Sequence, residues 1–275
     1  MLKLGIFSKT FPKPTLAETL DAVSALGVDQ VQLNAVPADL SPAACQKIHH
    51  EFQTRQLDLA ILSGTFNIIH PDPLTRRQGF DRFAVLAASA KSLGTQILSV
   101  STGTFDPEDM WRAHPRNETA EAWGNMLAAM AELATIAERQ DVTIAFEPEQ
   151  ANIVDSAQKA RALLDAFQSK HVKVLIDAAN LLTLSNLPEQ ERTLRMAFDF
   201  LGEDIVAAHA KEFSANGTLG NAVLGSGVVD FALYTSLLRQ LNRPISLIMH
   251  GFSEYDAKQS LAHMSFLQAS NTVRQ

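Results

Sequence analysis

The sequence has almost no cysteine: Cys45 is the single one. One thiol can form neither an internal disulfide nor a thiolate metal cluster, so the fold depends on no oxidising compartment. Long apolar runs are missing as well, because runs such as 59–62 end far short of the roughly 20 residues that cross a bilayer. The chain starts in a predicted strand, without the features of a secretory signal. We therefore expect a cytoplasmic protein with no membrane association.

An excess of positive charge is also lacking. The chain has 23 Lys and Arg against 30 Asp and Glu, a formal charge of −7, and no dense basic stripe. Non-specific nucleic-acid binding relies on neutralising phosphates with such residues, so we expect no nucleic-acid partner. A small anionic ligand stays compatible with this composition because it needs only a few local cations.

The sequence does contain a regular alternation of two kinds of segment. Short apolar, β-rich runs predict eight strands at 2–7, 28–33, 57–62, 95–100, 142–146, 172–177, 204–209 and 245–249. Helical signals fill the gaps. They include a capping box at Thr15 to Glu18, Ser41 before Pro42, and glycines at 27, 94 and 202 in helix-ending positions.

Eight such units in 275 residues average about 34 residues each, which suits a (β/α)₈ chain. A doubly wound open sheet also alternates strand and helix, but no linker-like stretch divides the chain. The sequence predicts one α/β domain over residues 1–275, a single TIM barrel. We expect longer loops at Thr102 to Asn117 and Phe213 to Gly227.

Ionisable residues end four consecutive predicted strands, and in a barrel the carboxyl ends of the strands carry function. They are Glu147, Asp177, His209 and His250. Such a side chain at the end of a buried strand is costly unless it is paired or coordinated. Any one of them has an ordinary structural explanation, such as a core histidine or a helix cap. Together, two carboxylates and two imidazoles predict a divalent metal site suited to Mn, Fe, Co, Ni or Zn rather than Mg.

Several short motifs occur in an informative order and spacing. They are Phe146-Glu147-Pro148, Asp177-Ala178-Ala179-Asn180, His209-Ala210-Lys211-Glu212, Gly225-Ser226-Gly227-Val228-Val229-Asp230-Phe231, and Asn67 with His70-Pro71-Asp72. Over nearly the whole chain, this series resembles the xylose isomerase-like TIM barrels, which include sugar-phosphate isomerases and epimerases. The resemblance implies a metal-dependent isomerase or epimerase of a small sugar or hydroxy-ketone, phosphorylated or not. It also implies proton transfer through a metal-stabilised enediolate, and a homodimer or homotetramer.

The resemblance further implies roles for single residues. The family's metal ligands, Glu, Asp, His and a final Glu, correspond to Glu147, Asp177, His209 and His250. In the ketose epimerases the two glutamates are also the acid/base pair, so Glu147 and His250 are the implied catalytic residues. His250 departs from that pattern and serves either as a ligand or as an acid/base. Glu254, four residues after His250, is a candidate to replace the carboxylate of the family's final glutamate. The alternative is that Glu254 is an ordinary solvated loop residue.

That departure keeps other functions open: a one-base isomerase, a dehydratase or aldolase-like lyase, or a non-catalytic sugar-binding barrel. An apurinic endonuclease of the same fold is disfavoured by the scattered histidines and the negative charge. The predicted substrate-binding residues are His70, Lys211, Asn180, which stands where many relatives have His, and Glu212.

Three weaker features complete the predicted site. Lys211 shares a strand face with His209 and could reach a substrate oxygen or phosphate, while Glu212 could orient a neighbour. The turn at 225–227 could offer backbone N–H groups to a phosphate. Trp111 and Trp123 flank a long loop and suit a lid, a subunit contact or plain packing.

Overall fold

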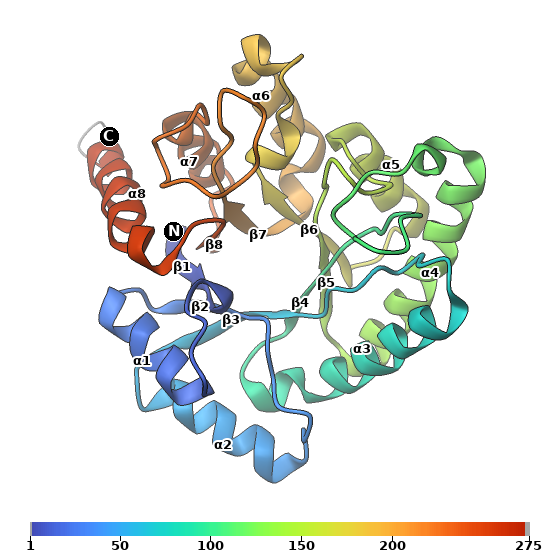
Figure 1. Cartoon of the computed structure of the whole chain (residues 1–275), viewed down its shortest axis with the longest axis horizontal. Coiled ribbons are helices and arrows are strands. Elements are labelled where there is room, and N and C mark those ends of the chain that lie inside the picture. Colours follow the sequence, from blue (N-terminus) through green and yellow to red (C-terminus); the bar gives the residue numbers. More distant parts are fainter. Residues whose placement is uncertain (1, 273–275) are drawn as a thin grey trace.

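Eight parallel strands close into one barrel in the order β1 to β8, and the helices surround it (Figure 1). The computed structural model describes residues 2–272, so residues 1 and 273–275 of the predicted domain lie outside the described residues. The strands are β1 Leu2–Phe7, β2 Gln30–Leu33, β3 Asp58–Ser63, β4 Ile97–Val100, β5 Thr143–Phe146, β6 Val172–Asp177, β7 Ile205–Ala210 and β8 Ile245–Met249. The predicted TIM barrel is confirmed.

The main helices are α1 Leu16–Leu26, α2 Pro42–Gln53, α3 Pro73–Leu93, α4 Ala120–Gln140, α5 Ala157–Phe167, α6 Gln190–Leu201, α7 Phe231–Gln240 and α8 Ala257–Thr272. Short 3-10 helices supplement them: η1 Ser8–Thr10, η2 Pro115–Glu118, η3 Ala179–Leu181, η4 Leu187–Glu189, η5 Gly202–Asp204 and η6 Glu254–Asp256. Among the described residues, no helix combines the length and the hydropathy needed to cross a membrane.

The predicted helix-end signals are confirmed. Thr15 and Glu18 form the expected capping box. Gly27 and Gly94 cap their helices in the left-handed region, at φ of 90° and 103°, where a side chain would be strained. Gly202 also lies at a helix end, but its φ of −50° is right-handed, because the chain continues into η5 instead of turning. Gly202 therefore ends its helix as predicted, in a right-handed conformation.

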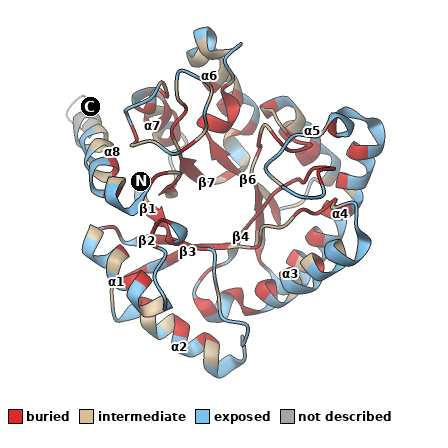
Figure 2. Ribbon diagram, viewed as in Figure 1, coloured by how far each residue is buried: buried red, intermediate tan, exposed pale blue. Residues whose placement is uncertain are grey.

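Side chains inside the barrel form a small apolar cluster separate from the layer between strands and helices, and buried residues concentrate on the strands and the inner helix faces (Figure 2). The interior cluster consists of Phe7, Ile61, Ala145, Leu175, Ala207 and Ile248. Because strand side chains alternate between faces, residues two positions further along the chain also point toward the barrel axis. For β5 to β8 these are Glu147, Asp177, His209 and His250, so the apolar interior is the floor beneath them.

Two long irregular segments lie at the carboxyl side of the barrel, as predicted. The loop after β4 runs to η2, and Asn67 and Asn117 hold it through hydrogen bonds to the loop backbone at Thr104 and Phe105. The loop between β7 and α7 is drawn in orange in Figure 1 and contains an isolated antiparallel bridge between Phe213 and Leu219. Both loops border the strand ends where the ionisable residues gather.

Candidate metal centre

Glu147, Asp177, His209 and His250 form one compact group at the carboxyl ends of β5 to β8. Each offers one donor atom, and the four atoms lie within 4.8 Å of one another. Asp177, His209 and His250 are buried, and Glu147 is partly accessible. The sequence predicted these residues as neighbours, and the structure brings all four together.

His209 stands between two polar partners. Its Nδ1 lies 3.0 Å from Glu147 Oε1, and its Nε2 lies 2.6 Å from Gln32 Oε1. An amide oxygen only accepts hydrogen bonds, so Nε2 carries the hydrogen. The lone pair of Nδ1 in the neutral ring then faces a carboxylate oxygen, and a proton or a cation must lie between the two acceptors.

Asp177 and His250 make the second close contact of the group. Asp177 Oδ1 accepts a hydrogen bond from the Ala179 backbone N–H, whereas Oδ2 lies 3.3 Å from His250 Nε2. Burial raises the pKa of Asp177, and Lys211 and His209 only partly offset this effect. Burial, together with the nearby His209 and Lys211, holds the pKa of His250 well below its usual value. His250 is therefore a neutral imidazole at physiological pH, which is the form that binds metals.

Lys211, Asn180 and Glu149 surround the group. Lys211 Nζ donates to Asn180 Oδ1 at 2.5 Å and lies 3.7 Å from Glu149 Oε2. Asn180 Nδ2 donates in turn to Glu147 Oε1 at 2.9 Å. Burial of Glu147 opposes its ionisation, but His209 and Lys211 outweigh this and lower its pKa. Glu147 is thus held as an oriented carboxylate.

The residues fit a divalent cation. Two carboxylates and two imidazoles supply oxygen and nitrogen donors, and the charge of the two carboxylates would balance a dication. The close approach of His209 Nδ1 and Glu147 Oε1 is satisfied either by a proton or by a cation that replaces it, so a metal ion fits at this point. Gln32 meets the usual requirement that a ligating histidine bonds an acceptor through its other nitrogen.

Two of the predicted substrate-binding residues lie in the loops. The Nε2 of His70 is 3.0 Å from the Pro107 carbonyl oxygen, and its Nδ1 accepts from the Asp72 backbone N–H at 3.1 Å. Glu212 is fully buried, and its oxygens accept from the backbone N–H groups of Phe213, Gly225 and Val229. Both side chains make hydrogen bonds to the loop backbone. Lys211 and Asn180 instead contact the group of Glu147, Asp177, His209 and His250, called the metal group from here on.

The structure also places three weaker candidate features. The N–H groups of Gly225 and Ser226 already bond Glu212 and Val223, so these groups of the turn are not open to a phosphate. Glu254 is exposed and ion-paired with Lys13 at 2.8 Å, outside the metal group. Trp123 packs against the core, and Trp111 is 50% exposed.

Sequence reasoning missed Gln32 and Glu149. Gln32 lies in the fully buried strand β2, whose polar residues alternate with apolar ones, and this alternation is the signal for an inward amide. Glu149 lies in the loop after β5, 3.7 Å from Lys211 Nζ, where no strand alternation indicates the direction of its side chain. Burial raises its pKa.

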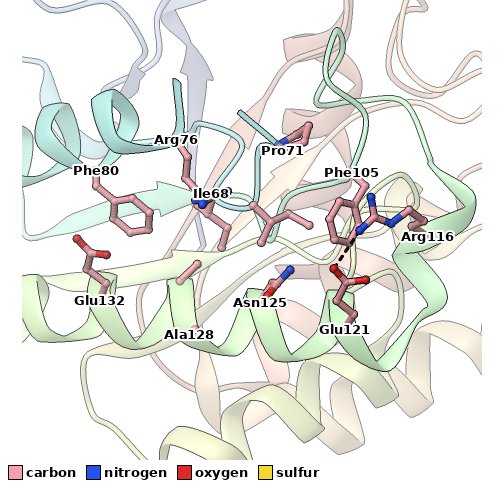
Figure 3. A pocket seen from close by; sticks show the side chains of 12 residues that line it. Ile68, Pro71, Arg76, Phe80, Phe105, Arg116, Glu121, Asn125, Ala128 and Glu132 are labelled. Carbon is pink, nitrogen blue, oxygen red and sulfur yellow. Dashed lines mark hydrogen bonds and ion pairs between the residues drawn. The ribbon is translucent and has the colours of Figure 1, made fainter. Parts of the chain in front are cut away.

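A separate cavity of about 440 Å³ lies between α3 and α4 (Figure 3). Ile68, Phe80 and Phe105 line its apolar side, and Arg116 pairs with Glu121 at its rim. No member of the metal group lines this cavity. This cavity is therefore separate from the four-donor group.

The closed barrel and the four-donor group together define a (β/α)₈ protein with a candidate metal centre. Residues 20–269 match the family model described as xylose isomerase-like TIM barrel, and the chain belongs to that family.

The relatives of the chain are sugar epimerases. The chain is 23% identical over 257 residues to L-ribulose-5-phosphate 3-epimerase UlaE of Escherichia coli O1:K1 / APEC, covering 87% of this chain and 83% of the relative. The structure is similar to a D-tagatose 3-epimerase-like protein, with a TM-score of 0.79, 13% identity and 99% of each chain covered. It is also similar to L-ribulose 3-epimerase, with a TM-score of 0.76, 17% identity and coverage of 100% and 98%. These structural likenesses show the shared fold.

Proposed function

We propose that this protein is a divalent-metal-dependent isomerase or epimerase of a small phosphorylated ketose. The observation that carries the proposal is the group of four donor atoms within 4.8 Å at the ends of β5 to β8. Membership in the xylose isomerase-like family and the sugar epimerases among the relatives support it. We assign Glu147, Asp177, His209 and His250 as the residues that would hold the metal.

Glu147 is the base of the proposed reaction. Asn180 donates a hydrogen bond to its Oε1, and His209 Nδ1 lies 3.0 Å from the same oxygen. Among the described residues, Oε2 has no bonding partner, so it is open to a substrate. Glu147 removes a proton from the carbon beside the substrate carbonyl. It returns the proton to the adjacent carbon in an isomerisation. In an epimerisation, solvent would supply a proton to the same carbon on its other face, and Glu147 would release its own proton to solvent.

The surrounding residues keep the Glu147 carboxylate oriented and ionised. Asn180, fixed by Lys211, orients Glu147, and the lowered pKa of Glu147 keeps it ionised as a base. A bound dication would stabilise the negative charge that develops on substrate oxygen when the proton leaves. Glu212 and His70 act as positioning residues for the loops around the mouth.

A phosphate fits at the carboxyl ends of β1 and β2. A cavity of about 410 Å³ there is lined by Lys9, Lys13, Ser8 and Asn34, among others. Glu254 neutralises Lys13, whereas Lys9 is solvent-accessible, and its described contact is with the face of Phe7, 4.5 Å from the ring centroid. Lys9 is the open cation beside the metal group. The matched relative is named for a phosphorylated pentulose, which agrees with this assignment.

The test is solvent exchange. Tag-free protein, analysed for its metal content and loaded with Mn²⁺ or Zn²⁺, is incubated with ketopentose and ketohexose phosphates in D₂O and followed by proton NMR and mass spectrometry. We expect deuterium beside the carbonyl and an isomeric product, and neither with Glu147→Gln. Absence of both exchange and product in the metal-loaded protein would overturn the proposal.

His250 favours one alternative. It stands where the epimerase pattern has a second glutamate, and a single carboxylate base without that partner suits elimination by a lyase. A product lighter than the substrate by one water would identify that reaction. Stabilisation by the sugar without exchange would identify a binding barrel.

A further inference from the structure

Gln32 has no place in the ligand set, yet it bonds directly to a candidate ligand. We propose that Gln32 is a positioning residue that selects Nδ1 of His209 as the metal-binding atom. This inference rests on the metal centre of the proposed function. The selection works through the hydrogen-bonding chemistry of a single buried amide.

The amide of Gln32 is held at both ends. Its side chain enters the barrel from β2 and is 1% exposed. Its Nε2 donates to Ser99 Oγ on β4 at 3.2 Å, and its Oε1 lies 2.6 Å from His209 Nε2. Water has little access to either contact, so each bond is costly to lose.

This arrangement decides which ring nitrogen of His209 is free. A neutral imidazole carries one hydrogen, and the amide oxygen of Gln32 requires that hydrogen on Nε2. The lone pair then lies on Nδ1, the nitrogen that faces Glu147 across 3.0 Å. With the amide reversed, the hydrogen would sit on Nδ1, in the space between His209 and Glu147 that the metal needs.

A neutral amide also preserves the charge balance of the site. The surrounding carboxylates Glu147, Glu149 and Asp177 face a single buried ammonium, that of Lys211. A carboxylate at position 32 would fix the same ring nitrogen but would add another buried negative charge. Gln32 supplies the acceptor without that charge.

The experiment compares two substitutions of different chemistry. Gln32→Glu keeps an acceptor for His209, whereas Gln32→Leu removes it. The dissociation constant of Zn²⁺ is measured by chelator competition on initially metal-free protein, beside the melting temperature of that protein. We expect Gln32→Leu to weaken Zn²⁺ binding by roughly 10- to 100-fold, as loss of an outer-shell partner typically does. Gln32→Glu should stay within about tenfold of wild type.

The matched control is Gln30→Leu. Gln30 is equally buried two residues away on the same strand, but its amide bonds Asp58 and Ser246 instead of the metal group. It should lose stability without losing Zn²⁺ affinity. Equal weakening in Gln32→Glu and Gln32→Leu would overturn the proposal, because it would mean that Gln32 donates to His209. A Gln32→Leu variant that binds Zn²⁺ as tightly as wild type would overturn the proposal as well.

A second measurement does not depend on whether the variants fold. Nitrogen-15 NMR of the imidazoles in metal-free wild type, at a pH where His209 is neutral, reports its tautomer directly, with His209→Asn providing the assignment. Hydrogen on Nε2 is the expected result, and hydrogen on Nδ1 contradicts the inference. The expected tautomer without sugar turnover would contradict only the proposed function, and turnover with the opposite tautomer only this inference.

Discussion

His250 Nε2 lies 3.3 Å from Asp177 Oδ2, so a neutral ring faces a carboxylate at the end of β8. This contact fills the place where the family resemblance predicts a final glutamate. We expect His250→Ala to weaken metal binding at least about 100-fold, more than loss of an outer-shell partner costs. His250→Glu restores an oxygen donor and should retain the metal. Elemental analysis and Zn²⁺ competition measure both, and full metal retention in His250→Ala would remove this residue from the ligand set.

Glu147→Gln should abolish turnover while leaving the fold intact. A positioned base typically contributes 10²- to 10⁴-fold, so we expect kcat to fall by at least about 100-fold. Deuterium exchange into substrate measures the loss, and circular dichroism checks the fold. Glu254→Gln is the matched control, because Glu254 lies near the mouth but pairs with Lys13. A Glu147→Gln variant with wild-type exchange would exclude Glu147 as the base.

Stabilisation by metal should increase with pH. Burial raises the folded-state pKa of Asp177 and of Glu149, so the unfolded chain loses these protons first, near pH 4. Their contribution to metal-free stability is present below that pH and is lost as pH rises through the folded pKa. A bound cation offsets the ionised Asp177. We expect the rise in melting temperature on adding Zn²⁺ to be larger at pH 7.5 than at pH 5, and an equal rise would contradict this account.

Gly227 provides the space for the buried carboxylate of Glu212. A Cβ at Gly227 would lie 2.5 Å from the Glu212 carboxyl carbon. Gly227→Ala should therefore destabilise the protein by about 1–3 kcal/mol, the usual cost of overpacking, and displace the loop before α7. Gly124→Ala, in α4 with nothing within 4 Å of its Cβ, should instead stabilise by about 0.5–1 kcal/mol. The denaturant midpoints of the two variants test this prediction. A change of stability in the same direction in both variants would contradict the packing argument.

Lys9→Met should affect phosphorylated substrates selectively. A hydrogen bond to a charged group contributes about 1.5–3 kcal/mol, so KM for a ketose phosphate should rise about 10- to 100-fold. KM for the unphosphorylated sugar should stay constant. Lys3→Met is the control, because Lys3 lies at the amino end of β1 near Asp58. Equal effects on both substrates would place the phosphate elsewhere.

Local sequence was sufficient to predict the secondary-structure elements and the group of four donor residues. Apolar runs and helix caps act over a few residues, so the eight strands were predictable, and four strand ends pointed to Glu147, Asp177, His209 and His250. The resemblance to the xylose isomerase-like barrels, based on short motifs in order, is confirmed by the family match. The alternation of polar and apolar residues in β2 also indicates Gln32 as an inward side chain, whereas Glu149 lies in the loop after β5 and has no such signal.

The partners of each side chain were decided by tertiary structure. Gln32 reaches His209 across 177 positions of sequence, and Glu212 turns away from the site to bond backbone 17 residues ahead. Such contacts depend on barrel closure and loop packing, which no local pattern encodes. The sequence determined which donors stand at the carboxyl ends of the strands. The closed barrel decided which of them meet, which nitrogen of His209 is free and which carboxylates are buried, because these depend on distance and solvent access.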